Sequence, residues 1–203
     1  MFQQLFNLTG KTALVTGASS GLGRAIATAY AQSGAKVVAL GRSQQKLNEL
    51  SQESDQFILK NIDITDKDAI KNMRHDIESD NIKIDILVNA AGVGIIKPLE
   101  SLSEEDFDRS IDINLKGTFY LLKNFLPKMK AAKKGLVINI PGVLGKTPMA
   151  GAMAYSASKY GLNGMLKSVR EELRRTEVRI TNLYLGGVDS PFWDDIDMRI
   201  NRD

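Results

Sequence analysis

The chain has 203 residues, a length that fits one ordinary domain and excludes a long repeat array or a multidomain machine. It contains no cysteine and one histidine, which excludes disulfides, thiolate catalysis, iron–sulfur clusters and histidine-rich metal sites, so we expect no metal site. The net charge is +3, the uncharged runs are too short to span a membrane, and the N-terminus does not resemble a signal peptide. These features predict a cytoplasmic protein that binds neither nucleic acid nor membrane.

Short β-type runs alternate along the chain with segments of helical periodicity. Strands are expected over 12–16, 36–40, 56–62, 84–88, 136–140 and 178–184. Helices are expected from 22 to just before Gly34, and over 43–53, 66–79, 103–131 and 155–174. Strands rich in Val, Ile and Leu that alternate with helices of crossover length are typical of a parallel sheet covered on both faces. The predicted fold is therefore α/β, a doubly wound parallel sheet, with residues 1–203 as one domain.

The first expected strand is followed by a glycine-rich turn that leads directly into a helix. The turn reads TGASSGLG from Thr16 to Gly23. Its glycines permit a tight turn and close approach to a pyrophosphate, and the helix N-terminus offers unpaired N–H groups. We expect the dinucleotide to contact Gly17, Ser19, Ser20, Gly21, Leu22 and Gly23. A glycine-rich turn without a ligand is the alternative interpretation.

The residues after the next strands indicate which dinucleotide binds. NAD-binding folds usually have an acid at the end of the second strand, but this chain has Gly41 and Arg42 there. A guanidinium at this place pairs with a 2′-phosphate, which favours NADP over NAD, although a surface arginine at a helix start is the alternative. The residues after the third and fourth strands are expected to contact the adenine. They are Asp63, Ile64, Asn89, Ala90 and Ala91.

Tyr155 and Lys159 are four residues apart at the start of an expected helix, so they project from one face. A phenol has an ordinary pKa of about 10, and a nearby ammonium lowers the pKa by favouring the phenolate. Asn114 lies on the apolar stripe of its own helix, where its amide either satisfies a helix contact or anchors a water of a proton relay.

Together these motifs resemble the short-chain dehydrogenase/reductase family, whose members have a Rossmann-like fold, over residues 8–192. The family's cofactor glycines correspond to Gly17, Gly21 and Gly23, its adenine-contacting acid to Asp63, its NNAG-like stretch to 89–92, its catalytic Asn to Asn114 and its YxxxK pair to Tyr155 and Lys159. The resemblance implies that Tyr155 is the general acid/base and that Lys159 binds the nicotinamide ribose and lowers the pKa of Tyr155. It also implies that Asn114 holds a water linking Lys159 to solvent, and that hydride passes between NAD(P) and a carbonyl or alcohol.

The chain departs from the family pattern at its catalytic serine, where Gly142 stands, and at a proline replaced by Leu185. The missing hydroxyl would hydrogen-bond the substrate carbonyl, and losing one such donor costs about 100- to 1000-fold in turnover. Thr147 and Ser156 are the nearby hydroxyls, but neither matches the family position. Val188 and Ser190 are expected to contact the nicotinamide carboxamide and the pyrophosphate.

Two functions follow from this pattern. The first is an NADP(H)-dependent carbonyl reductase or alcohol dehydrogenase impaired at Gly142, and the alternative is an NADP-binding module without efficient catalysis. The resemblance implies a homodimer or homotetramer that pairs through the helices over 103–131 and 155–174. It also implies a seventh strand that we do not find, so residues 187–203 are expected to be a truncated substrate lid and strand 178–184 an exposed edge.

Overall fold

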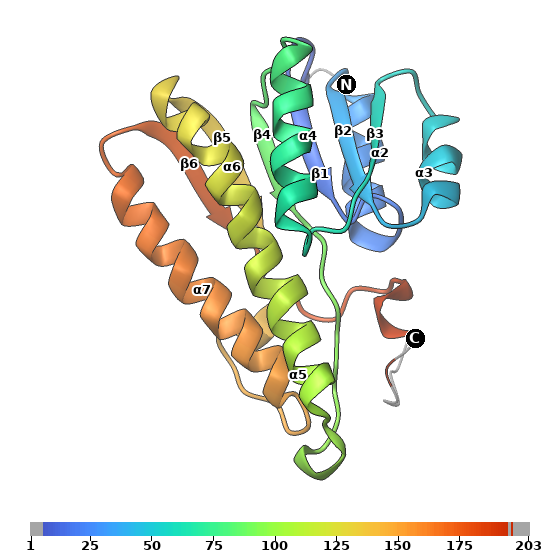
Figure 1. Ribbon diagram of the computed structural model, residues 1–203, viewed down its shortest axis with the longest axis vertical. Coiled ribbons are helices and arrows are strands. Elements are labelled where there is room, and N and C mark those ends of the chain that lie inside the picture. Colours follow the sequence, from blue (N-terminus) through green and yellow to red (C-terminus); the bar gives the residue numbers. More distant parts are fainter. Residues whose placement is uncertain (1–5, 195, 197–203) are drawn as a thin grey trace.

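The computed structural model describes residues 6–194 and residue 196, and it forms an α/β structure around one parallel sheet (Figure 1). The strand order is β3-β2-β1-β4-β5-β6. The strands are β1 (Thr12–Thr16), β2 (Lys36–Gly41), β3 (Phe57–Asn61), β4 (Ile86–Asn89), β5 (Lys134–Asn139) and β6 (Glu177–Asn182). The predicted six-stranded, doubly wound parallel sheet is confirmed. Its order reverses between β1 and β4, the place where such sheets bind ligands.

Helices cover both faces of the sheet because successive side chains of each strand point to opposite faces. One core contains Ala13 and Val37 with buried residues of α2 (Gly21–Gln32) and α3 (Gln44–Ser51). The other core contains Leu14, Val38 and Leu87. Against it pack α4 (Lys67–Ser79), α6 (Gly117–Ala131) and α7 (Met153–Leu173). Figure 1 shows these two helical layers on either side of the strands.

The long helix expected over 103–131 is one rod with an interruption. It consists of α5 (Glu104–Ile111), a π-helical segment η2 (Asp112–Lys116) and α6. A capping box begins it, with Ser103 Oγ accepting from Asp106 N at 3.1 Å. The expected long helix is present, with a π-helical segment in its middle that contains the candidate residue Asn114. Such wide turns are frequent at functional sites.

β6 lies at one edge of the described sheet and pairs with β5. Its residues alternate between exposed and buried, with Val178 and Ile180 packed inward, as in a strand with one solvated face. The predicted lid is described as far as Asp194 and at Ile196, and the rest of 187–203 lies outside the described residues. The described helices include none with the length and apolar character needed to cross a membrane.

Candidate active site

A cavity of about 120 Å³ lies where β1 and β2 end and the glycine turn begins. Among its lining residues are seven predicted cofactor contacts: Gly17, Ser19, Ser20, Arg42, Asp63, Ile64 and Ala91. The structure therefore brings together residues from the ends of β1, β2, β3 and β4. It adds Gly41, Gly92 and Ile113, which the motif analysis did not select as contacts.

The glycine turn has the backbone geometry that its sequence predicts. Gly17 and Gly21 have φ angles of +69° and +51°, in the left-handed region that side chains disfavour. A Cβ on Gly23 would stand 2.3 Å from Gly17 O, so only glycine lets α2 approach the turn this closely. The first turn of α2 follows directly, and Ser20 at its N-cap makes no side-chain capping bond. The N–H groups at this helix start are suited to a phosphate.

Arg42 and Asp63 lie on the open side of this cavity. Arg42 Nη1 is 3.9 Å from Asp63 Oδ2, and the arginine side chain is 62% exposed. Asp63 also accepts hydrogen bonds from the backbone N and the hydroxyl of Thr65 through its other oxygen. Because an exposed pair at this distance is weak, the guanidinium remains accessible to a phosphate.

Asn89 is turned into the sheet, and neither Asn89 nor Ala90 lines the cavity. Asn89 Nδ2 donates to Asn139 Oδ1 at 2.8 Å, and Asn139 Nδ2 donates to Asn182 Oδ1 at 3.2 Å. These three residues are partners in the parallel register of β4, β5 and β6. In this structure the Asn89 side chain therefore joins strand ends, and its expected adenine contact stays a prediction.

The three predicted catalytic residues converge beside Gly92. A Cβ on Gly92 would lie 3.1 Å from Asn114 Oδ1 and 3.6 Å from Lys159 Nζ. Lys159 Nζ lies 5.4 Å from the Tyr155 ring centroid and donates to Ile140 O at 3.1 Å. The four-residue spacing on α7 and the π-helical segment of the long helix thus bring together Tyr155, Lys159 and Asn114, of which Lys159 and Asn114 are buried and Tyr155 is partly buried.

Asn114 uses its amide to hold the surrounding backbone. Its Oδ1 accepts from Val93 N at 2.9 Å, and its Nδ2 donates to Val93 O at 2.9 Å and to Ser158 Oγ at 3.0 Å. Ser158 Oγ in turn donates to Tyr155 O at 2.7 Å. The side chain therefore satisfies contacts between elements, one of the two interpretations open from the sequence, and it connects η2 to the turn of α7 that carries Tyr155.

Burial shifts both ionisable groups toward their neutral forms. Burial raises the pKa of Tyr155 to about 12 and lowers the pKa of Lys159 to about 8. The expectation of a lowered pKa for Tyr155 is wrong for this structure, because removal of the phenol from water raises that pKa. At neutral pH Tyr155 is therefore a phenol with a proton to give.

Gly142 has a backbone conformation that goes with its lack of a side chain. Its φ is +69° and its ψ 173°, a region used almost only by glycine. A Cβ built there would lie 4.0 Å from Tyr155 Oη, so this position does border the tyrosine hydroxyl. The alternative hydroxyl of Ser156 is buried and makes no hydrogen bond within the described residues.

Residues 188–193, which follow β6, contact both the glycine turn and Tyr155. A Cβ on Gly21 would lie 3.6 Å from Ser190 Cβ, which puts the predicted contact Ser190 beside the glycine turn. The Phe192 ring packs against the Tyr155 ring with centroids 5.9 Å apart. Trp193 Nε1 donates to Val188 O at 2.9 Å, which holds the segment together. Neither Val188 nor Ser190 lines the cavity.

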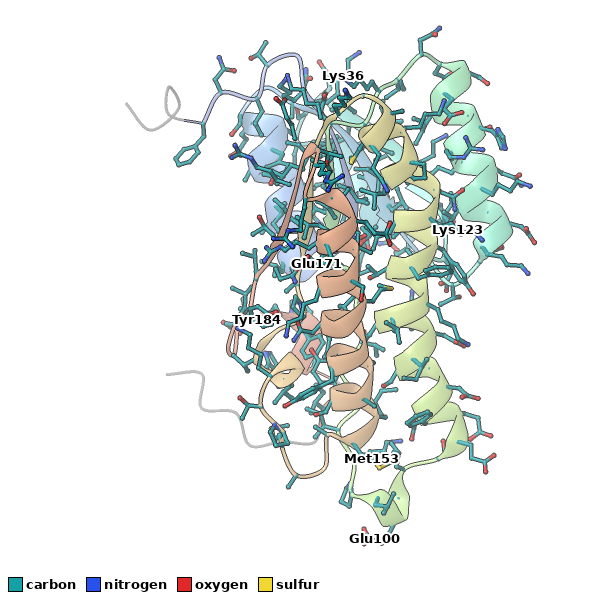
Figure 2. All side chains as sticks on the ribbon, turned by 90° about the vertical axis from the view of Figure 1, so that its left-hand side faces the viewer. Lys36, Glu100, Lys123, Met153, Glu171 and Tyr184 are labelled. Atoms are coloured by element: carbon teal, nitrogen blue, oxygen red, sulfur yellow. The ribbon has the colours of Figure 1, made fainter. Side chains whose placement is uncertain are left out.

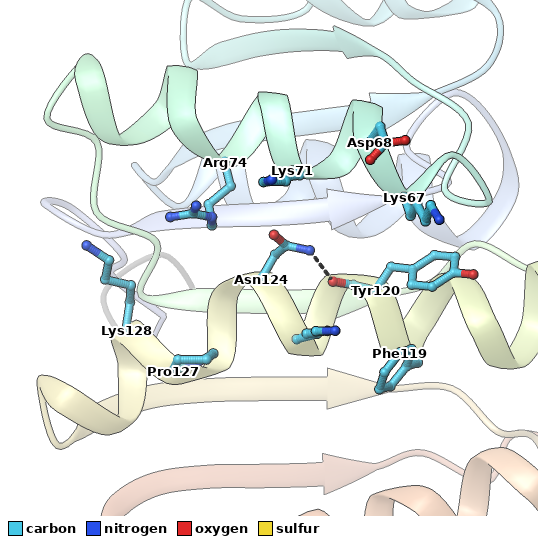
Figure 3. Close-up of a pocket in the computed structure, with 10 residues that line it drawn as sticks. Lys67, Asp68, Lys71, Arg74, Phe119, Tyr120, Asn124, Pro127 and Lys128 are labelled. Atoms are coloured by element: carbon cyan, nitrogen blue, oxygen red, sulfur yellow. Dashed lines mark hydrogen bonds between the residues drawn. The ribbon is translucent and has the colours of Figure 1, made fainter.

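A larger cavity, about 550 Å³, lies between α4 and α6 (Figure 3). Its lining includes Lys71, Arg74 and Lys123 with the rings of Phe119 and Tyr120. Neither cavity is lined by Tyr155, Lys159 or Asn114, but seven predicted cofactor contacts line the smaller cavity and none lines the larger one. Because ligands of this sheet architecture bind at the strand ends, the smaller cavity and the adjoining group around Tyr155 are the candidate active site.

Several residues that shape the site were not predicted from the sequence. Ser158 and Val93 bond to Asn114, and Gly94 admits the Phe192 ring, since an added Cβ would meet that ring's Cζ at 2.5 Å. Their positions along the chain could have indicated them. Val93 and Gly94 come shortly after β4 ends, and Ser158 stands between Tyr155 and Lys159 on α7.

Known proteins resemble this chain over most of its length. A family model described as short chain dehydrogenase matches residues 11–200. An uncharacterized oxidoreductase of Staphylococcus epidermidis is 36% identical over 188 residues, covering 92% of this chain and 82% of the relative. The 3-oxoacyl-[acyl-carrier-protein] reductase of Thermotoga maritima is 35% identical over 191 residues, covering 91% and 76%. The crystal structure of a metagenomic short-chain oxidoreductase in complex with NADP superposes with a TM-score of 0.83 at 40% identity, covering 89% of this chain and 84% of the other. With this match and the convergence of Tyr155, Lys159 and Asn114 beside Gly92, the chain belongs to the short-chain dehydrogenase family.

Proposed function

We propose that the protein is an NADP(H)-dependent oxidoreductase that reduces a carbonyl compound to an alcohol. The observation that carries the proposal is the buried group of Tyr155, Lys159 and Asn114 beside the cavity at the β1–β4 switch point. A phenol whose pKa is raised to about 12 is protonated at neutral pH and suited to give a proton to a carbonyl oxygen. This protonation state favours the reductive direction.

The residues present fit a dinucleotide. The left-handed glycines and the start of α2 suit the pyrophosphate, and the cavity with Ile64 and Asp63 suits the adenosine. Arg42, exposed at the edge of that cavity, would bind a 2′-phosphate through charge-assisted hydrogen bonds. The NADP in the related metagenomic structure supports the same choice for this chain.

Bound NADPH would supply the hydride that adds to the carbonyl carbon. Tyr155 Oη would donate its proton to the carbonyl oxygen, so that the carbonyl becomes an alcohol and the phenol becomes a phenolate. Lys159, whose pKa burial lowers to about 8, would lie close enough to stabilise the phenolate and to pass on a proton. Asn114 would position both residues through Ser158 and Val93, and its relay water stays a prediction.

Turnover is expected to be slow because the hydroxyl at position 142 is missing. Without it Tyr155 alone would hydrogen-bond the carbonyl oxygen, and loss of one such donor costs about 100- to 1000-fold. A serine substituted at position 142 would not simply restore the hydroxyl. At a φ of +69° it would strain the backbone by about 1–3 kcal/mol.

We infer further that two copies pair through the long helix and α7. Acidic residues gather at 100–112, around Glu104 and Asp108, whereas 116–134 carries lysines such as Lys123 and Lys130 and no acid. An antiparallel pair of these helices would place the acidic half of one copy on the basic half of the other. Exposed apolar residues lie on the same helices: Phe107 on α5, Phe119 on α6, and Met153 and Tyr160 on α7. The long helix and α7 run side by side in Figure 2.

The decisive experiment measures NADPH oxidation against a panel of ketones and aldehydes, with NADPH binding followed separately by fluorescence. The parent is expected to turn over slowly, and Tyr155→Phe is expected to bind NADPH as tightly but to lose at least a hundredfold in turnover. Binding of NADPH without turnover of any carbonyl would instead support the alternative, a cofactor-binding module. Sedimentation of the parent and of Phe119→Arg tests the pairing, which the charged side chain should disrupt.

A further inference from the structure

Gly142 leaves a small open place directly beside the tyrosine hydroxyl. Apart from its chain neighbours, two atoms of the described residues lie within 4 Å of a Cβ built on Gly142. They are Leu185 O at 3.7 Å and Tyr155 Oη at 4.0 Å. The place is therefore bordered by a carbonyl acceptor and by the proposed acid.

The backbone around this place has its hydrogen-bond donors already in use. Gly142 N donates to Leu183 O at 3.3 Å, and Val143 N donates to Leu185 O at 3.0 Å. The amides therefore do not replace the missing serine hydroxyl. Leu185 O still has a second lone pair, because a carbonyl oxygen accepts two hydrogen bonds. What the place lacks is a donor for that lone pair.

Resting on the proposed function, we propose that the substrate is an α-hydroxy carbonyl compound whose hydroxyl occupies the place beside Gly142 and donates to Leu185 O. Its carbonyl oxygen would accept from Tyr155 Oη. The hydroxyl oxygen would lie in van der Waals contact with the Cα of Gly142, on the side where a Cβ would project, at ordinary hydrogen-bond distance from Leu185 O. The carbonyl oxygen and the hydroxyl sit on adjacent carbons, so one small molecule reaches both groups.

The reaction balances as a carbonyl reduction. Hydride from NADPH adds to the carbonyl carbon, Tyr155 Oη gives its proton to the carbonyl oxygen, and the product is a vicinal diol. The α-hydroxyl keeps its own proton throughout, so it acts in positioning and not in proton transfer. A site with an acceptor in this position discriminates against analogues that bring no donor, because Leu185 O loses water without gaining a partner.

Three ketones of similar size test the inference in the parent protein. They are 1-hydroxy-2-butanone, 1-methoxy-2-butanone and 3-pentanone, each measured for kcat/KM with saturating NADPH. The methoxy compound keeps an electron-withdrawing oxygen but donates no proton, and 3-pentanone replaces the hydroxyl by a methyl group. We expect the hydroxyketone to exceed each of the others by about tenfold or more, the effect of one net hydrogen bond. Equal values overturn the inference and leave the proposed function standing, whereas no turnover of these or any panel carbonyl overturns both.

A matched pair of glycine variants locates the effect. Gly142→Ala puts a methyl group into the place, so the ratio of hydroxyketone to methoxyketone should fall to about one. Gly10→Ala makes the same change at a φ of +75° with nothing within 4 Å, before β1 and remote from the site, so it should keep the parent ratio. A folded Gly142→Ala that keeps the preference overturns the inference. If circular dichroism shows that Gly142→Ala does not fold, the three ketones in the parent decide.

Discussion

The ring of Phe192 lies across the ring of Tyr155, with centroids 5.9 Å apart and planes inclined by 55°. Trp193 packs edge-on against Phe192 at 5.2 Å and so supports it from the far side. This contact joins the segment after β6 to the start of α7. Burial is the physical cause of the raised pKa of Tyr155, and the Phe192 ring covers part of the tyrosine ring.

Replacing Phe192 should therefore move the pKa of Tyr155. Phe192→Ala admits water, so the pKa is expected to fall from about 12 toward the ordinary value. Phenolate absorbance during an alkaline titration measures it, after subtraction of the same titration in a Tyr155→Phe background. Phe6→Ala removes a ring that is 64% exposed before β1 and serves as the control. An unchanged titration in Phe192→Ala would show that other groups cause the burial.

Lys159 should make stability depend on pH in a defined window. Its pKa is about 8 in the folded protein and ordinarily 10.5, so between these pH values the unfolded chain binds the extra proton. Folding stability therefore rises with pH across the window, and the buried ammonium destabilises the fold below it. Relative to Lys159→Met, the parent should gain about 3 kcal/mol between pH 8 and 10.5. Urea unfolding of both proteins at pH 7.5, 9 and 10.5 measures the gain, and parallel curves would contradict it.

Asn114 should matter for stability as well as for the site. Asn114→Ala leaves Val93 N and Val93 O without their partner, and each buried unpaired group costs about 1–3 kcal/mol. The expected loss in the free energy of unfolding is about 2–5 kcal/mol. Asn124→Ala is the control, because its amide donates to a carbonyl of its own helix, Tyr120 O. A loss as small as that of the control would mean that the Val93 segment finds other partners.

Arg42 should set the preference between the two nicotinamide cofactors. Arg42→Ala removes the accessible guanidinium, so the Kd for NADPH should rise by about tenfold or more while the Kd for NADH changes little. Titration of intrinsic fluorescence with each cofactor gives both constants. Arg109→Ala, which removes an exposed arginine of α5, should leave both unchanged. Equal weakening of NADPH and NADH binding would mean that Arg42 does not recognise the 2′-phosphate.

The local sequence pattern was sufficient to predict most strands and helices and several of the residues that line the cavity at the strand ends. The runs 12–16 and 36–40 are strands because their apolar residues are buried on both faces, and the positive φ angles of Gly17 and Gly21 follow from turn chemistry. Arg42 and Asp63 meet because parallel strands end at one edge of the sheet. Such features depend on neighbours in sequence and on the regular geometry of the sheet.

The amino-acid sequence by itself determined the doubly wound order of elements and the glycine turn, and its resemblance to the family made Tyr155, Lys159 and Asn114 the catalytic candidates. Only the tertiary structure decided that Asn89 bonds across the sheet, that a π-helical segment carries Asn114 and that Gly142 opens a place beside Leu185 O. It also reversed the expected pKa shift of Tyr155. The reason is that burial and side-chain direction arise where distant segments pack together. The spacing of residues along the chain does not show which side chains this packing removes from water.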